Sequence, residues 1–221
     1  MVFVEAARRV DGLLEKRPLG LLGAYERPLM EQLLPSSTTL HRFAIALLFV
    51  GILVAMGRAR FYLPDNPVPI TLQTFGVLAA GGVLGLRWGM FTILTYYFLG
   101  MAGVPVFKDG GNGWAYLSGT PTAGYIIGFI AATWLVGYLS QHGWSRARVL
   151  WPMLLGSLLV YVPGLLWLHY FDFGWPAPGE LFSAGMYPFI PGDLVKLMGA
   201  AIVVGGLWTL ADRRRGGQPG G

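Results

Sequence analysis

The sequence predicts an all-α membrane protein with six transmembrane helices and both ends of the chain in the cytosol. Apolar residues make up 54% of the 221 residues and charged residues only 12%, whereas a soluble domain carries about 25% charged residues. The apolar residues fall into runs close to the length of a membrane span. The basic residues gather in alternate loops between these runs. Together, these observations argue against an ordinary soluble globular domain.

Six apolar runs can each form a helix that crosses the bilayer, which needs about 17–25 mostly apolar residues. The first run is short unless Arg58 extends its side chain toward the membrane surface. The runs occupy most of the chain after residue 42, so the loops are short and leave no room for a soluble catalytic domain. We expect the spans at residues 43–57, 69–86, 88–106, 124–140, 149–169 and 194–211.

Residues 1–42 differ in composition from the rest of the chain. They hold six basic and five acidic residues, and a rough helical stripe of apolar residues is broken at Pro18 and Pro28. No uninterrupted apolar stretch of the kind a secretory signal needs is present. We expect residues 1–42 to be a cytosolic extension, either amphipathic at the membrane surface or disordered. Residues 212–221 read as a basic, glycine-rich cytosolic tail.

The loop charges predict the orientation. With the N-terminus inside, twelve Lys and Arg residues fall in inner segments and four in outer segments. Inner loops of membrane proteins are enriched in Lys and Arg, so both termini are expected in the cytosol. No predicted span carries a charge near its middle, which argues against a proton relay, a voltage sensor or an ion-coupled transporter. Five acidic residues fall on the outer side: Asp65, Asp109, Asp172, Glu180 and Asp193.

The composition also bears on cofactors and partners. The chain has no Cys and three widely spaced His residues, which argues against disulfides, thiolate metal sites and a zinc site. The net charge of +5 is explained by basic residues at the membrane surface, so we expect no nucleic-acid partner. We expect no cofactor, no metal and no catalytic residue.

The first outer loop leads into the second span. Three prolines within residues 64–69 stiffen this loop and prevent a helix there. Thr71, Gln73 and Thr74 follow at the start of the span. These polar residues can cap the helix, or Gln73 can line a pocket that opens outward.

The second outer loop, residues 103–125, is rich in glycine and aromatic residues. Glycine lets a backbone pass close to another group, and polar and aromatic side chains together are typical of a small-molecule site. The alternative is an aromatic belt at the membrane surface with turn glycines. The candidate binding residues here are Asn112, Trp114, Tyr116, Thr122 and Tyr125.

The third outer segment places two charges at the start of the last span. Asp193 follows Pro191-Gly192 at or near a helix N-cap, and Lys196 lies three residues later on the same face. A lysine is unfavourable at the positive N-terminal end of a helix. This cost favours a charged pair that faces a cavity over a simple cap and a lysine that reaches the surface.

Small residues recur every four positions in the first span, at Gly51, Ala55 and Ala59. Such spacing permits close helix packing. The ridge can pack within the chain, or it can present a groove to a partner membrane protein.

Four motifs, in this order, resemble the BioY family: Pro67–Gly76 (PVPITLQTFG), Leu99–Phe107 (LGMAGVPVF), Pro121–Tyr125 (PTAGY) and Pro188–Lys196 (PFIPGDLVK). The Tyr161–Trp167 segment also resembles the family's fifth span. The resemblance covers about residues 43–211. The chain departs from the family in its long N-terminal extension and in Thr120, where many members have Gly.

The resemblance implies an S-component-like fold in the cell (inner, cytoplasmic) membrane. Members of this family are biotin-binding S components of energy-coupling factor (ECF) transporters, which capture biotin from outside for ATP-driven uptake. The implied partners are a transmembrane coupling protein and two ABC-type ATPases, and no enzyme activity is implied. The alternatives are an S component for another vitamin, a structural membrane subunit without a ligand, and an intramembrane enzyme, for which the spans offer no catalytic constellation.

Biotin has a ureido head, an apolar bicyclic body and a carboxylate tail. On this resemblance, Asp193 is expected to accept a hydrogen bond from a ureido N–H, and Lys196 to donate to the ureido carbonyl. The small-residue ridge is expected to dock the coupling protein. The remaining candidates are Asn112, Gln73, Tyr125 and Thr122 for the polar shell, Trp114, Tyr161 and Trp167 for the apolar wall, and Arg58, Arg60 and Lys108 for the carboxylate.

Overall fold

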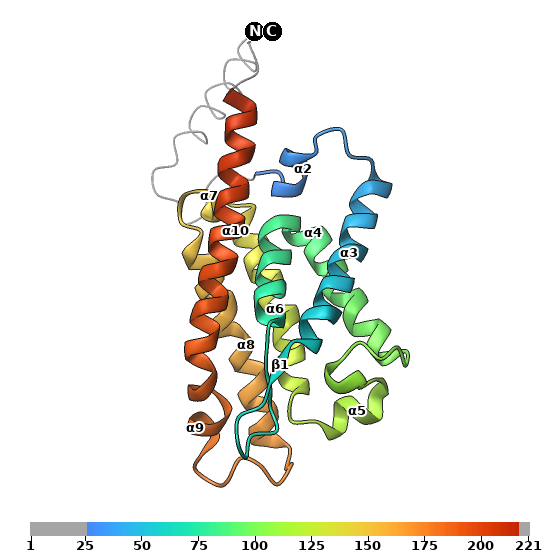
Figure 1. Cartoon of the computed structure of the whole chain (residues 1–221), viewed down its shortest axis with the longest axis vertical. Coiled ribbons are helices and arrows are strands. Elements are labelled where there is room, and N and C mark those ends of the chain that lie inside the picture. The colour runs from blue at the N-terminus through green and yellow to red at the C-terminus, as the bar shows by residue number, and fades with distance from the viewer. Residues whose placement is uncertain (1–25, 217–221) are drawn as a thin grey trace, which may run out of the picture.

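The computed structural model describes residues 26–216 and shows an elongated bundle of helices (Figure 1). Five helical segments are long and apolar enough to cross a membrane: Thr39–Arg58, Gln73–Met101, Ala123–Ser140, Leu150–Tyr170 and Leu181–Arg214. The C-terminal end of the last segment lies at one end of the bundle. The short strands, α5 and α9 lie toward the opposite end, which we call the loop end.

The elements follow one another as helices with short connections. The long helices are α3 (Thr39–Arg58), α4 (Gln73–Met101), α6 (Ala123–Ser140), α8 (Leu150–Tyr170) and α10 (Ile190–Gly216). The short ones are α2 (Leu29–Leu33), α5 (Gly113–Gly119), α7 (Trp144–Ala147), α9 (Leu181–Gly185), and the 3-10 turns η1 (Lys108–Gly110) and η2 (Tyr187–Phe189). Strands β1 (Arg60–Phe61) and β2 (Ile70–Thr71) pair antiparallel, with Arg60 opposite Thr71.

Helix α4 reverses direction at Gly85. This residue has φ +70° and ψ −172°, a backbone conformation that glycine adopts far more readily than other residues. A Cβ on Gly89 would lie 3.4 Å from the carbonyl oxygen of Ala80, although nine residues of straight helix would separate them by about 13 Å. The helix therefore consists of two arms, residues 73–84 and 86–101, folded back on each other.

The two arms correspond to the predicted second and third spans. Their outer ends differ from the prediction because the segment before Gln73 contains Pro67 and Pro69 and forms β2, and because the helix stops at Met101. Most ends of the other long helices lie within a few residues of the ends of the predicted spans. Five segments meet the criteria of length and composition, so the count of six spans stays a prediction.

Glycines on α6 allow it to lie between α4 and α8 at close backbone distance. A Cβ on Gly128 would lie 2.5 Å from the carbonyl oxygen of Val160 on α8, and one on Gly137 would lie 2.8 Å from the Cα of Leu86 on α4. No larger residue fits at either position without a shift of the neighbouring helix. Close approach of this kind stabilises helix pairs in membranes, where there is little hydrophobic drive between helices.

The part of the predicted N-terminal extension that the structure describes is folded. Leu29 and Met30 of α2 are buried, with exposed fractions of 1% and 3%, in the same apolar cluster as residues of α4 and α10. Helix α3 begins at Thr39, where Thr38 and His41 form a capping box, so the predicted boundary at residue 42 lies inside this helix. Residues 1–25 and 217–221 lie outside the described part.

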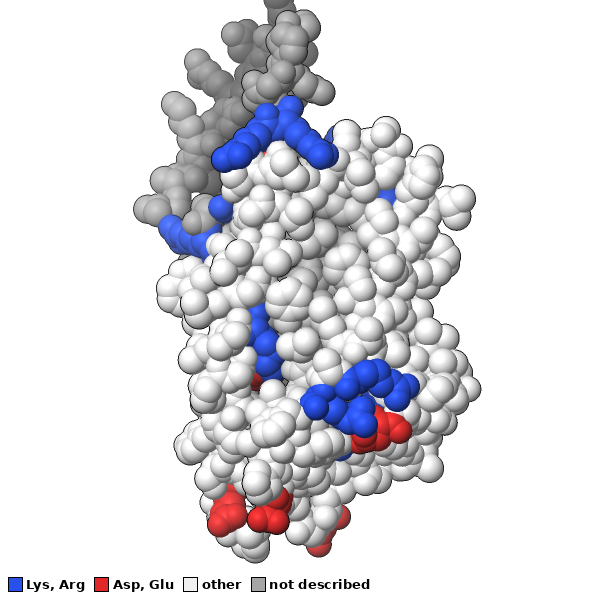
Figure 2. Space-filling view, viewed as in Figure 1, with Lys and Arg blue, Asp and Glu red and all other residues white. Residues whose placement is uncertain are grey.

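The surface matches the requirements of a membrane protein. Large apolar side chains are exposed along α3, α8 and α10, among them Leu48, Leu158 and Ile202, where lipid contact would satisfy them. Figure 2 shows basic groups near the end where α10 finishes, acidic groups at the tip of the loop end, and a basic cluster with acidic neighbours in the half nearer the loop end. Both halves hold charges of both signs, so the orientation in the membrane stays a prediction.

Candidate functional site

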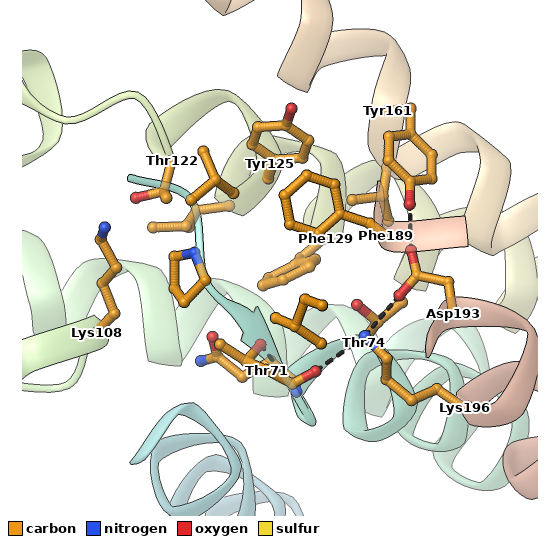
Figure 3. Close-up of a pocket in the computed structure, with 16 residues that line it drawn as sticks. Thr71, Thr74, Lys108, Thr122, Tyr125, Phe129, Tyr161, Phe189, Asp193 and Lys196 are labelled. Carbon is orange, nitrogen blue, oxygen red and sulfur yellow. Dashed lines mark hydrogen bonds and ion pairs between the residues drawn. The ribbon is translucent and has the colours of Figure 1, made fainter. Parts of the chain in front are cut away.

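A pocket opens in the half of the bundle nearer the loop end, between the starts of α4, α6 and α10 and the middle of α8 (Figure 3). Its volume is about 70 Å³, whereas one water needs about 10–15 Å³. The lining is apolar at Val68, Pro69, Ile70, Ile126, Phe129, Val160 and Phe189, polar at Thr71, Gln73, Thr74, Thr122, Tyr125 and Tyr161, and charged at Lys108, Asp193 and Lys196.

The charged pair at the start of α10 is buried in this lining. Lys196 Nζ lies 2.6 Å from Asp193 Oδ1, and the two side chains are only 8% and 12% exposed. The hydroxyl of Tyr161 donates to the other carboxylate oxygen, and Nζ also donates to the carbonyl oxygen of Thr71 at 3.0 Å. Figure 3 shows these groups together on one side of the pocket. Buried charges persist only when they are paired in this way.

Aromatic residues form the wall beside this pair. Tyr125 packs edge-to-face against Tyr161, with ring centroids 6.3 Å apart. Its hydroxyl donates to the carbonyl oxygen of Gly185 at 2.6 Å, which ties α6 to α9. Phe129 and Phe189 also line the pocket near Tyr125 (Figure 3). The wall offers flat apolar surfaces, which suit a ring system in a ligand.

Two further predicted polar residues also line the pocket. Gln73, at the first position of α4, is 5% exposed, and its side-chain nitrogen donates to the hydroxyl of Tyr96 at 2.8 Å. Thr122 precedes α6, and its hydroxyl is 3.0 Å from that of Thr120. The structure therefore brings Asp193, Lys196, Gln73, Thr122, Tyr125 and Tyr161 to one pocket.

Four of the predicted polar and aromatic residues do not line this pocket: Asn112, Trp114, Tyr116 and Trp167. The hydroxyl of Tyr116 donates to the carbonyl oxygen of Lys108 at 3.2 Å. Asn112 donates to the carbonyl oxygen of Gly110 within its own loop, and Trp114 is 63% exposed on α5. The indole N–H of Trp167 donates to the carbonyl oxygen of Thr120. Asn112, Trp114 and Tyr116 belong to the glycine-rich loop, whose composition alone could not indicate which of its side chains face inward.

Of the three cations considered for a carboxylate, Lys108 alone lines the pocket. Arg60 pairs with Asp109 at 2.6 Å, and Arg58 donates to the carbonyl oxygen of Pro105. Lys108 Nζ donates to the carbonyl oxygen of Pro67 at 2.8 Å and lies across the pocket from Asp193 (Figure 3). Burial lowers the pKa of Lys108, while the neighbouring carboxylate of Asp109 opposes that shift.

Several pocket residues were not predicted. Ile126, Phe129 and Val160 lie within apolar spans, where nothing in the sequence separates a side chain that faces a cavity from one that faces the core or lipid. Thr74 and Phe189 lie within motifs in which other residues were the predicted binding residues. Among residues 26–216, no group of three His, Asp or Glu residues could hold a metal ion.

Comparison with known proteins identifies the family and agrees with the fold. A family model described as the BioY family matches residues 30–213. The chain is 40% identical over 160 residues to a probable biotin transporter BioY from Pyrococcus horikoshii, a match that covers 72% of this chain and 91% of the relative. It is 36% identical over 141 residues to the biotin transporter BioY of Thermotoga maritima, covering 64% and 81% respectively.

A solved structure is similar over most of the bundle. It is described as the S-component for biotin from an ECF-type ABC transporter, and it matches with a TM-score of 0.66 and 25% identity. The match covers 77% of this chain and 94% of the other. With the apolar helices described above, these likenesses indicate a multi-pass membrane protein. The chain belongs to the BioY family.

Proposed function

We propose that this chain is the biotin-capturing S component of an ECF-type transporter, a binding subunit and not an enzyme. The names of its relatives and of the similar structure support this proposal. Within the chain, the observation that supports this proposal is the buried Asp193–Lys196 pair, which lines a pocket with aromatic walls. Such a pair is costly to bury, and a ligand that uses both charges gives it a purpose.

The pocket residues fit the parts of biotin. The Asp193 carboxylate accepts a hydrogen bond from a ureido N–H, and the Lys196 ammonium donates to the ureido carbonyl. Tyr125 and Tyr161 pack against the apolar bicyclic body. Lys108, across the pocket, attracts the carboxylate tail. Hydrogen bonds to charged groups are worth about 1.5–3 kcal/mol each, so this arrangement supports tight and selective binding.

The same proposal includes the topology. Six spans, both termini in the cytosol and a pocket that opens outward follow from twelve basic residues in inner segments against four in outer ones. The reversal at Gly85 supports counting the arms of α4 as two spans. The membrane would be the cytoplasmic membrane of the cell, and ATP-driven uptake would be powered by two ABC-type ATPases.

We further propose that the small-residue ridge of α3 docks the coupling protein. Gly51, Ala55 and Ala59 are exposed, and a Cβ on Gly51 would meet nothing within 4 Å. The ridge therefore does not serve packing within the described chain. A smooth helix face of this kind allows close approach of a helix from another membrane protein.

Replacement of Ala55 by Trp tests this docking site. The bulky ring would separate the helices, so the variant should fail to copurify with the coupling protein, while its biotin affinity stays within about twofold of the wild type. Leu158→Trp, at an exposed position on α8, places the same ring on a different helix, so it is the matched control and should still assemble. Loss of biotin binding with assembly retained would show that the ridge acts in internal packing.

The proposed ligand is tested by what the protein carries. Mass spectrometry of small molecules released from the purified, denatured chain should find biotin, whose mass identifies it directly. A thiamine-like or riboflavin-like ligand would contradict the biotin assignment but leave the S-component fold intact. An empty chain that also fails to bind added biotin would contradict the function.

A further inference from the structure

The side-chain amide of Gln73 is held from behind by residues that do not line the pocket. Its nitrogen Nε2 donates to the hydroxyl oxygen of Tyr96 at 2.8 Å and to the carbonyl oxygen of Leu53 at 3.3 Å. Neither Tyr96 nor Leu53 belongs to the pocket lining, whereas Gln73 does. Both amide hydrogens are therefore committed to the protein and not to a ligand.

The hydroxyl of Tyr96 has a fixed direction. It donates to the carbonyl oxygen of Val106 at 3.3 Å, and a hydroxyl has only one hydrogen to give. Toward Gln73, the oxygen of Tyr96 can then only accept. The ring is 1% exposed and packs edge-to-face against Phe107, with centroids 5.6 Å apart. The contact therefore distinguishes the nitrogen of the amide from its oxygen.

A glycine makes room for this arrangement. A Cβ on Gly57 would lie 2.8 Å from Gln73 Nε2, so a side chain at position 57 would push the amide away from α3. The other end of the amide, Oε1, has no hydrogen-bond partner within residues 26–216, and it is not among the fully buried atoms that lack one. It keeps accessible surface on a side chain that lines the pocket.

We propose that Tyr96 is a positioning residue that turns the Gln73 amide so that its carbonyl oxygen meets the ligand. The pocket then requires an N–H at this point and rejects a ligand that presents an acceptor there. The inference rests on the proposed function: one ureido N–H of biotin pairs with Asp193, and the other pairs with Gln73 Oε1. Tyr96 thus contributes to specificity without touching the ligand.

Two analogues of biotin test this arrangement. In each, one of the two ureido N–H groups is replaced by an oxygen atom, which gives two cyclic carbamates. Calorimetric titration of the detergent-purified wild type should find both bound at least about tenfold more weakly than biotin, because each leaves an acceptor facing an acceptor. One carbamate places its oxygen against Gln73 and the other against Asp193.

Tyr96→Phe separates positioning from a merely structural role. Without the hydroxyl, only the longer 3.3 Å contact with the carbonyl oxygen of Leu53 holds the amide, so the amide can rotate and donate to the ring oxygen of the carbamate. The preference for biotin over the Gln73-facing carbamate should then fall to about threefold or less. The preference over the other carbamate should stay as in the wild type. Tyr97→Phe, whose hydroxyl has no hydrogen bond within the described residues, is the matched control and should change neither preference.

The outcomes are distinct. If Tyr96→Phe weakens all three ligands by one common factor, or changes nothing, Tyr96 does not set the polarity of the site and the inference is overturned. Gln73→Met supplies a second check, because it removes the acceptor and should also narrow the preference against one carbamate only. If it keeps the wild-type preferences, the inference fails. Absence of biotin binding in the wild type would overturn both the proposed function and this inference.

Discussion

The two halves of the bundle each hold a close ion pair, and the two pairs differ in burial. At the pocket, Lys196 and Asp193 lie 2.6 Å apart with side chains 8% and 12% exposed. At the opposite end, Arg146 and Asp212 also lie 2.6 Å apart, but their side chains are 41% and 36% exposed. The distance between the charges therefore does not distinguish the two pairs. Desolvation makes the first pair costly to bury, whereas water still solvates much of the second.

The packing around the two pairs differs in the same way. Around Asp193 the described chain leaves a cavity. At the far end, α2 inserts Leu29 and Met30 into an apolar cluster that also contains Trp208, and Pro28 packs against the turn at Gly85. Within the described residues, a cavity thus lies near the loop end, whereas α2 covers the apolar cluster at the other end.

The largest expected effect comes from breaking the buried pair on one side only. Lys196→Met leaves the Asp193 carboxylate buried with the Tyr161 hydroxyl as its main partner, and such a break costs about 3–5 kcal/mol of unfolding free energy. A lower thermal midpoint in detergent would report this loss. The double variant Asp193→Asn/Lys196→Met removes both charges and should recover most of the midpoint. Equal midpoints for the single and double variants would contradict the account.

A smaller effect is expected at the turn of α4. Gly85→Ala forces a side chain onto a backbone with φ +70° and places a Cβ 3.0 Å from the ring of Pro28, which should cost about 1–3 kcal/mol. Gly206→Ala on exposed α10, where a Cβ meets nothing within 4 Å, is the control and should be neutral or slightly stabilising. Thermal unfolding of both variants makes the comparison. Equal midpoints would mean that the turn tolerates a side chain.

The smallest effect is expected at the exposed pair. Arg146→Gln removes the contacts with Asp212 and with Glu26, whose carboxylate lies 3.7 Å away. Exposed ion pairs contribute about 1 kcal/mol or less, and salt weakens them further. The midpoint should therefore fall slightly at low salt and hardly at all at high salt. Arg213→Gln, at an exposed arginine with no ion pair in the described chain, serves as the control. A loss as large as that of Lys196→Met would remove the distinction between the two pairs.

Much of this architecture could be predicted because it depends on local pattern. Apolar length predicts the helices, and the Pro-Gly break before Asp193 predicts the start of α10 and the shared face of Asp193 and Lys196. The two apolar runs at residues 69–86 and 88–106 predict a break in α4 between them. The cause of the break, the positive φ of Gly85, depends on the tertiary structure. Some of the pocket lining was predicted as well, namely Gln73, Thr122, Tyr125, Tyr161, Asp193 and Lys196. The prediction missed Thr71 and Thr74 and wrongly included Asn112.

Other features could not be predicted from local pattern. The folding of residues 26–38 against the bundle depends on contacts of α2 with α4 and α10, which are remote in sequence. Asn112 and Trp114 belong to a loop whose composition is typical of a binding site. The path of the loop, however, decides which of its side chains turn inward. The hydrogen bond between Gln73 and Tyr96 joins the two arms of α4, so it exists only because the helix reverses.

Calorimetric titration of biotin into the purified chain, with and without the Asp193 charge, tests the central claim most directly. The wild type should bind one biotin per chain. Asp193→Asn should bind about 10- to 150-fold more weakly, because a charged hydrogen-bond acceptor is lost from a buried site. The double variant Asp193→Asn/Lys196→Met should also bind biotin more weakly, and its thermal midpoint serves as the check that it is folded. Near-normal biotin affinity in these variants would contradict the assignment and leave the pair as a helix cap and its neighbouring lysine.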